Sequence, residues 1–369
     1  MDPISQAAIG AVAPQAVLKR EKIRVAALLG CLAGLAPDLD VLIQSPTDPL
    51  LFLEYHRQFT HALTFVPLGA AIVALALHGF ARRRLRFRET YLACLLGYAT
   101  HGLLDACTSY GTLLLWPFSD ERVAWNSVSV VDPLFTLPLL SLAILAAVRR
   151  RRAFAIAGLV WALGYLAFGA VQHQRAEAAG TRLAAERGHD PVRLSAKTGF
   201  GNLLVWKVVY EHEGRFHIDG IRTGWAVTAC PGATAVRLDL RRDFPWLDPD
   251  SQQALDVERF RWFSSDYLAR DPKLPHRIID VRYSVVPNTV DPLWGIDLDP
   301  GAAPNSHVRY FADRRARAEQ TDAYWRLLTG EDCPVRVGAP RGGQAGHPAP
   351  SVTTALGSAV PAGQEPCCD

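Results

Sequence analysis

The chain has 369 residues, of which 49% are hydrophobic, and a formal net charge of +3 at pH 7. Its basic residues gather in short clusters between apolar runs, which is typical of membrane topology and not of nucleic-acid binding. The composition changes along the chain, from sequence rich in Ala, Leu, Val and Gly to mixed sequence rich in Asp, Arg, Pro and Trp. We therefore expect an all-α membrane domain at residues 1–172, a soluble α+β domain at residues 173–338 and a disordered tail at residues 339–369.

Apolar segments of near-spanning length follow one another in the first part of the chain. They cover residues 25–43, 62–80, 91–118, 133–148 and 153–171. Because a spanning helix needs about 20 apolar residues, we predict about five spanning helices. The basic clusters "LKREKIR", "ARRRLRFR" and "RRRR" lie at alternate ends of these segments. Basic clusters stay on the cytoplasmic side, so a multi-pass protein with its C-terminal domain outside is expected.

The second part of the chain alternates predicted helices and strands. "VQHQRAEAAGTRLAAERG" has helical composition, and β-forming residues alternate around the turn "HEGR", which predicts a hairpin. A helix in "DSQQALDVERFRWFSSDYLA", a strand in "HRIIDVRYSVV" and an amphipathic helix closed by Gly330 follow. Cys230 and Cys333 also lie here, and spacing alone leaves open whether they pair in an extracytoplasmic domain.

Ionisable residues interrupt the apolar part of the chain at three places. His101 and Asp105 are four residues apart in "YATHGLLDACTSYGT" and share one face of a helix. "APDLDVLI" places Asp38 and Asp40 at the outer end of the first apolar segment, and "YHRQFTHAL" precedes the second. Taken singly, these residues also fit a self-satisfied buried pair, a charged helix terminus and a capping loop.

The three groups together favour a divalent metal site. All of them are predicted at one face of the membrane, and imidazoles with carboxylates suit zinc, manganese or iron. A cation would also compensate carboxylates that lie in an apolar surrounding without another partner. The number of ions, one or two, stays open.

The segments "PDLD", "YHRQFTHAL", "HGLLDACTSYGTLLLWPFS" and "VVDP" resemble, in this order, the signature segments of the YdjM family of bacterial inner-membrane proteins. The resemblance covers about the first 150 residues. The family is distantly similar to zinc-dependent phospholipase C, so it implies a metal-dependent hydrolase in the bacterial inner membrane, with a periplasmic C-terminal domain here. It implies zinc as the expected ion and the metal ligands Asp40, His61, His101 and Asp105.

The chain departs from the family pattern at its opening. The family typically reads "MDxxTHAxxG", whereas this chain reads "MDPISQAAIG", so Gln6 stands where a histidine ligand is expected. A glutamine is a poor zinc ligand, which favours a degenerate site. Residue 6 reaches the side of the other ligands only if residues 4–18 form an additional inserted helix, and this alternative stays open.

The favoured function is hydrolysis of a phosphoester, for example a phospholipid, at the outer membrane–water interface. The expected catalytic residues are Asp38 as general base, Arg57 as phosphate clamp and His56 in the second shell or facing the substrate. The lipid bilayer and a phosphoester are the expected partners, and no nucleic acid is. Two alternatives remain: a non-catalytic membrane protein with a structural or degenerate metal site that acts through its soluble domain, and a transporter with His101 and Asp105 on an ion path.

Overall fold

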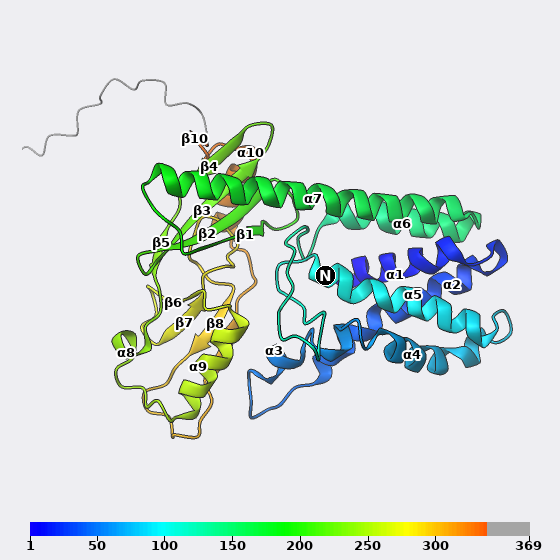
Figure 1. Cartoon of the computed structure of the whole chain (residues 1–369), viewed down its shortest axis with the longest axis horizontal. Helices are drawn as coiled ribbons and strands as arrows, with labels where there is room; N and C mark the ends of the chain where they lie inside the picture. The colour runs from blue at the N-terminus through cyan, green and yellow to red at the C-terminus, as the bar shows by residue number, and fades with distance from the viewer. Residues whose placement is uncertain (338–369) are drawn as a thin grey trace, which may run out of the picture. The chain divides into compact units, whose positions relative to one another are not determined.

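The computed structural model describes residues 1–337. An all-helical part comes first along this stretch, and a part that contains both strands and helices follows (Figure 1). A helical part runs from α1 (Pro3–Val17) to α7 (Arg152–Glu186), and a part with two β-sheets follows. This order confirms the predicted succession of a helical and an α+β part. The boundary predicted at residue 172 falls inside α7, which is one continuous helix of 35 residues. The predicted tail at residues 339–369 lies outside the described residues.

Short irregular segments separate the helices of the helical part. Between α1 and α7 lie η1 (Arg20–Lys22), α2 (Ile23–Leu35), η2 (Ala36–Leu42), α3 (Leu51–Tyr55), η3 (Phe59–His61), α4 (Val66–Ala81), α5 (Phe87–Ala106) and α6 (Pro133–Arg149). An aspartate caps the start of α1 and of α6, where Asp2 and Asp132 accept hydrogen bonds from backbone N–H groups. Each of these helices also begins with a proline, whose missing N–H costs nothing at that position.

The prediction of about five spanning helices is wrong. Within residues 1–337, two helical segments are long and apolar enough to cross a membrane, Arg20–Leu42 and Arg152–Glu186. A third is reached only if Leu51–His61 and Val66–Ala81, which meet at 85°, count as one broken span. Helix α6 has 17 residues and is too short, and α5 mixes several charged side chains into its 20 residues.

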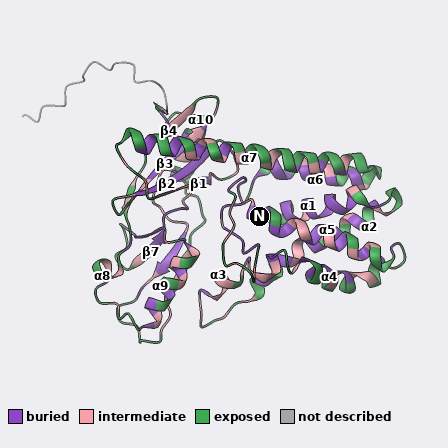
Figure 2. Ribbon diagram, viewed as in Figure 1, coloured by how far each residue is buried: buried purple, intermediate pink, exposed green. Residues whose placement is uncertain are grey.

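Large apolar side chains nevertheless cover the outer faces of several helices. The exposed residues on α4, α6 and α7 include Leu68, Ile72, Leu75, Leu134, Leu137, Val160, Leu163 and Phe168. The residues of these helices that face the other helices are buried (Figure 2). A soluble surface seldom exposes so much apolar area, whereas lipid accepts it, so the helical part belongs in a membrane.

Helix α1 is inserted among other helices and contacts α2, α5, α6 and α7. The structure therefore selects the alternative in which the first residues form an additional helix. Three glycines allow the backbones of α1, α2 and α5 to approach closely. A Cβ atom on Gly30 would lie 2.2 Å from the Gly10 carbonyl oxygen, and one on Gly97 would lie 2.3 Å from that of Gly30. Small residues at helix crossings are typical of membrane helices.

The sheet-containing part holds two antiparallel sheets. The first has the order β1–β2–β3–β4–β10, with β5 also paired to β3, and the second has the order β6–β7–β8–β9. The strands are β1 (Arg193–Thr198), β2 (Val205–His212), β3 (Arg215–Thr223), β4 (Val227–Cys230), β5 (Thr234–Val236), β6 (Leu268–Arg270), β7 (Arg277–Asp280), β8 (Trp294–Asp297), β9 (Arg309–Ala312) and β10 (Val335–Arg336). The helices are α8 (Leu240–Asp243), α9 (Gln252–Phe263) and α10 (Ala318–Thr329).

The predicted hairpin is confirmed as β2 and β3. His212 pairs with Arg215, and the two turn residues, Glu213 and Gly214, have φ values of 47° and 69°. Positive φ at both positions gives the turn the twist that suits a hairpin. The C-terminal half of α7 packs on one face of this sheet through Ala176, Ala179 and Leu183.

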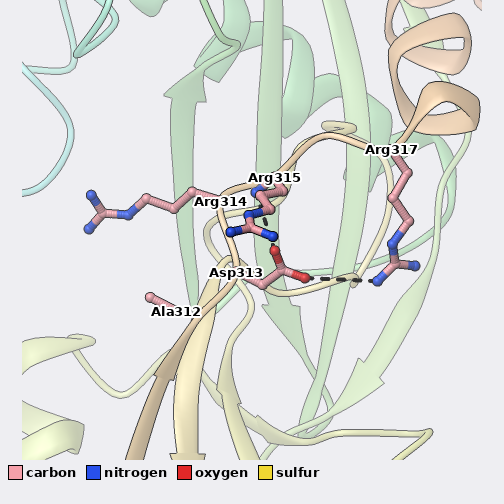
Figure 3. A pocket seen from close by; sticks show the side chains of 5 residues that line it. All are labelled: Ala312, Asp313, Arg314, Arg315 and Arg317. Carbon is pink, nitrogen blue, oxygen red and sulfur yellow. Dashed lines mark hydrogen bonds and ion pairs between the residues drawn. The ribbon is translucent and has the colours of Figure 1, made fainter.

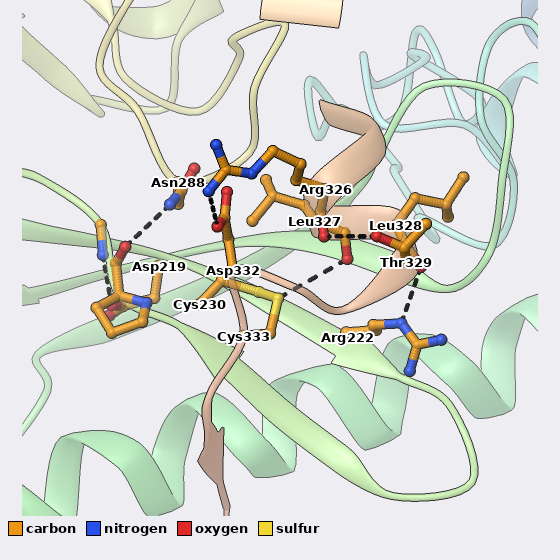
Figure 4. Close-up of a disulfide and its surroundings, with 12 residues drawn as sticks. Asp219, Arg222, Cys230, Asn288, Arg326, Leu327, Leu328, Thr329, Asp332 and Cys333 are labelled. Atoms are coloured by element: carbon orange, nitrogen blue, oxygen red, sulfur yellow. Dashed lines mark hydrogen bonds and ion pairs between the residues drawn. A yellow bond between two sulfur atoms is a disulfide. The ribbon is translucent and has the colours of Figure 1, made fainter. Parts of the chain in front are cut away.

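A disulfide joins the first sheet to the end of the described chain. The sulfur atoms of Cys230 and Cys333 are bonded, which closes a loop across 103 residues (Figure 4). Cys230 ends β4, and the same strand pairs with β10 through Ala229 and Val335. The pairing that spacing left open is therefore present in the structure.

Candidate metal centre

Four ionisable side chains from three separate segments meet at one end of the helical part. Each of them offers one nitrogen or oxygen atom, and these atoms all lie within 4.8 Å of one another. We call this group the His/Asp cluster; its members are Asp38 on η2, His61 on η3, and His101 and Asp105 on α5. The spacing of four residues on α5 places its two members on one face, and the η2 and η3 turns bring the others to them.

The two imidazoles of the His/Asp cluster face each other. The distance between the Nε2 atoms of His61 and His101 is 2.9 Å. The Oδ1 atom of Asp38 lies 3.5 Å from the first and 3.3 Å from the second. Asp105 Oδ2 closes the group at 3.5 Å from His61 Nε2 and 3.9 Å from His101 Nε2.

Hydrogen bonds on the far side of each ring fix the tautomers. The Nδ1–H of His101 donates to the carbonyl oxygen of Gly34 at 2.6 Å, because that oxygen can only accept. The Nδ1 of His61 lies 3.0 Å from Thr60 Oγ1 and 3.2 Å from Asp40 Oδ2, so it also carries the proton. Both Nε2 atoms then face the centre of the cluster, which is the orientation of histidines that bind metals.

Asp40 contacts Nδ1 of His61, on the side of the ring away from the other ligand atoms, and is not a member of the His/Asp cluster. Its carboxylate accepts hydrogen bonds from the Arg57 backbone N–H at 3.0 Å and from the Thr60 hydroxyl at 2.8 Å. His56 Nδ1 donates to it at 2.8 Å. Asp40 also forms a second potential metal group with Asp38 and His56. Asp40, predicted as a ligand, thus belongs to the second group alone, whereas Asp38, predicted as the general base, belongs to both groups.

Asp105 shows that the donor set suits a cation. Its Oδ1 accepts a hydrogen bond from Gln6 Nε2 at 2.9 Å and contacts the amino group of Met1. Its Oδ2 is buried and has no hydrogen-bond donor, although Arg57 Nε lies 3.1 Å away in an ion pair. The Gln6 Oε1 atom is buried without a partner as well. Buried oxygens without a hydrogen-bond donor, next to two imidazole nitrogens, are the kind of ligands that a divalent cation binds.

Arg57 connects the His/Asp cluster to the loop after α5. Its φ of 66° is left-handed, which costs a non-glycine residue on the order of 1 kcal/mol. The surroundings hold this backbone, since its N–H donates to Asp40 and its carbonyl accepts from Leu113 N at 3.0 Å. The guanidinium donates to Thr108 Oγ1 at 3.1 Å and lies 5.4 Å from the centre of the Tyr110 ring.

Exposure differs sharply within this group of side chains. The side chains of His61, His101 and Asp105 are at most 1% exposed. Those of Asp38 and His56 are 28% and 30% exposed. These two residues therefore form the side of the centre that is open to its surroundings.

Sequence reasoning missed the residues that support the ligands. Thr60 and the Gly34 carbonyl orient the imidazoles, and Gly102 lets α5 approach η3. A Cβ atom on Gly102 would lie 2.1 Å from the carbonyl oxygen of His61. The glycine directly after His101 was the available signal, because a glycine within a helix often marks a close approach.

Comparison with known proteins supports the assignment made from the motifs. Residues 1–176 match the model of a family described as YdjM inner membrane protein, which confirms the resemblance. The uncharacterized protein YfhP of Bacillus subtilis (strain 168) is 31% identical over 109 residues, which are 29% of this chain and 33% of that protein. The match thus spans about a third of the length of this curated relative. No solved structure matches the chain.

Proposed function

Because residues 1–176 belong to the YdjM family of inner membrane proteins, we propose that the chain is a membrane-bound, metal-dependent hydrolase of phosphoesters. The observation that carries this proposal is the convergence of two imidazole Nε2 atoms and two carboxylates within 4.8 Å. The buried Asp105 Oδ2 without a hydrogen-bond donor supports it. A buried polar group of this kind costs stability and is retained where it has a use.

In this proposal Asp38, His61, His101 and Asp105 would hold one divalent ion. Zinc is the expected metal, and manganese or iron suits the same donors. The ion, when bound, supplies Lewis-acid activation of water and of the ester. Asp40 keeps His61 in the ligating tautomer, and the Gly34 carbonyl does the same for His101.

The remaining polar residues serve the substrate. His56 donates its Nδ1–H to Asp40, which leaves Nε2 to accept or release a proton on the open side of the centre. Arg57 offsets the negative charge of a phosphate next to Asp105. Asp38, which the sequence assigned as general base, acts as a ligand here because its Oδ1 faces both imidazoles.

Metal analysis of the detergent-purified chain tests the proposal. The parent carries divalent metal and hydrolyses bis(p-nitrophenyl) phosphate or a short-chain phospholipid, whereas His101→Ala and Asp105→Asn lose both metal and activity. Asp40→Asn lowers metal affinity by about 10- to 100-fold, as expected for a residue that orients a ligand. His78→Ala, on α4 and outside the centre, serves as the matched control and keeps both properties.

Two outcomes would contradict the proposal. If His101→Ala retains its metal, the ion is not held by the His/Asp cluster. If the metal-loaded parent hydrolyses neither compound while the variants lose metal, the site is structural. The alternative then stands, a non-catalytic membrane protein that acts through its sheet-containing part, and Gln6 in place of a histidine favours it.

A further inference from the structure

A cavity with a basic lining lies in the sheet-containing part, at the segment that joins β9 to α10. Its volume is about 730 Å³, and its lining residues are Ala312, Asp313, Arg314, Arg315 and Arg317 (Figure 3). We call it the arginine cavity. Three arginines and one carboxylate, Asp313, line it. The ion pair between Asp313 and Arg317 is loose, at 3.9 Å, so most of the guanidinium N–H groups remain available to a ligand.

Arg314 extends away from Arg315 and Arg317 (Figure 3). Its guanidinium carbon lies 6.0 Å from the centre of the Trp294 ring on β8. The Trp294 ring in turn packs edge-on against Tyr110 with 5.2 Å between ring centres. Tyr110 lies 5.4 Å from the Arg57 guanidinium, and Arg57 Nε lies 3.1 Å from Asp105. A continuous line of contacts therefore joins the arginine cavity to the His/Asp cluster.

A further buried cation, Arg122, uses only part of its donors. Arg122 belongs to the loop between α5 and α6, and its guanidinium lies 5.1 Å from the centre of the Phe263 ring. One nitrogen donates to the Gly111 carbonyl at 3.2 Å, but Nε and Nη1 are buried without a hydrogen-bond partner. At the same junction, the Tyr283 hydroxyl donates a hydrogen bond to the Ser109 carbonyl. The junction of the two parts of the chain thus holds a buried guanidinium group whose Nε and Nη1 atoms have no hydrogen-bond partner.

We propose that the arginine cavity binds the phosphate of an anionic ligand. The planar guanidinium fork matches the phosphate oxygens, and the guanidinium groups that line the cavity outnumber its one carboxylate, which favours an anion. That this ligand is the substrate of the metal centre rests on the proposed function. The shared chemistry is a phosphate, which a phospholipid headgroup and a water-soluble phosphoester both carry.

Titration calorimetry on the full chain in detergent, with EDTA present, tests the binding step. Inorganic pyrophosphate is the probe, and EDTA removes metal that would otherwise bind it. Arg315→Ala/Arg317→Ala should weaken binding about tenfold or more, because it removes two guanidinium groups that can donate charge-assisted hydrogen bonds to the phosphate. Arg215→Ala, an exposed arginine at the start of β3, is the control and should bind as the parent does. Equal affinity of the parent and the double variant overturns the proposal.

A second titration separates the two sources of phosphate. Tighter binding of short-chain phosphatidylglycerol than of pyrophosphate assigns the cavity to a lipid headgroup, and the reverse order assigns it to a soluble phosphoester. If the parent hydrolyses phosphoesters, the double variant should raise KM and leave kcat unchanged. An unchanged KM would contradict delivery to the metal centre. A parent without activity removes the proposed function, while the calorimetric comparison still decides whether the cavity binds phosphate.

Discussion

Single atoms decide whether the His/Asp cluster can form. The sequence points to seven residues in three motifs, and the structure brings all seven into one network of contacts. The sequence could not show which carboxylate of "PDLD" faces the imidazoles. Residues two apart in a helical turn point in different directions, and the 3-10 turn of η2 sets which of Asp38 and Asp40 points inward. The sequence shows a glycine directly after His101, but not which backbone lies against it.

Gly102→Ala tests the close approach of α5 and η3. The added methyl group would meet the His61 carbonyl oxygen at 2.1 Å, so the η3 turn must move and the two Nε2 atoms must separate. We expect lower metal content and a lower melting temperature. Gly79→Ala on α4 has open space around its Cβ position, so it should retain the metal and gain up to about 1 kcal/mol of stability. Equal metal content in the two variants would show that this contact does not hold the site together.

At the scale of elements, burial on two sides limits what a sequence pattern can reveal. Strand β2 is buried on both faces, so alternation in "VWKVVYEH" predicts a strand but not where Lys207 points. In the structure it pairs across the sheet with Lys197 on β1, and both side chains are buried. Lys207 Nζ donates to Ser284 Oγ at 2.8 Å and to the Thr289 carbonyl at 2.6 Å. The five expected spans failed for a different reason, because an apolar run in the sequence does not show that its helix is too short, as in α6, or broken, as at α4.

These lysines make stability depend on pH. Burial lowers the pKa of Lys207 from 10.5 to about 7, and burial together with the nearby Arg282 does the same for Lys197. Between pH 7 and pH 10.5 the unfolded chain binds more protons than the folded one, so stability rises with pH. Each lysine contributes at most about 1.4 kcal/mol per pH unit. Denaturant unfolding from pH 7 to 9 should show the rise, and Lys207→Met should flatten it. The exposed control Lys273→Met should keep the slope of the parent, and an unchanged slope in Lys207→Met contradicts the account.

At the scale of the whole described chain, ion pairs and hydrogen bonds join the sheet-containing part to the helical part that carries the candidate metal centre. Arg259 on α9 forms ion pairs with Asp48 and Glu54, which flank the start of α3. Lys197 donates to Asn126 at 3.0 Å across the same junction. Sequence patterns predicted both parts, but no pattern within either part encodes contacts between them. Disulfides are rare in reducing compartments, so the disulfide of the second part agrees with the expected location outside the cytoplasm, which stays a prediction.

Reporter fusions test this location. We expect alkaline phosphatase fused after Gly188, just beyond α7, to be active, because that enzyme folds only outside the cytoplasm. The same reporter fused after Arg83, in the basic segment between α4 and α5, should be inactive. The reverse pattern would place the sheet-containing part in the cytoplasm and would remove the proposed action at the outer surface.

The position of α1 has a consequence for the order in which the centre matures. All four residues of the His/Asp cluster are synthesised by residue 105, yet Gln6 reaches Asp105 from a helix that also packs on α6 and α7. Helix α1 is therefore enclosed only when α6 and α7, which follow the His/Asp cluster in the chain, have packed against it. The contact that covers Asp105 depends on these later helices, whereas Asp38 and His56 remain on the open side of the centre.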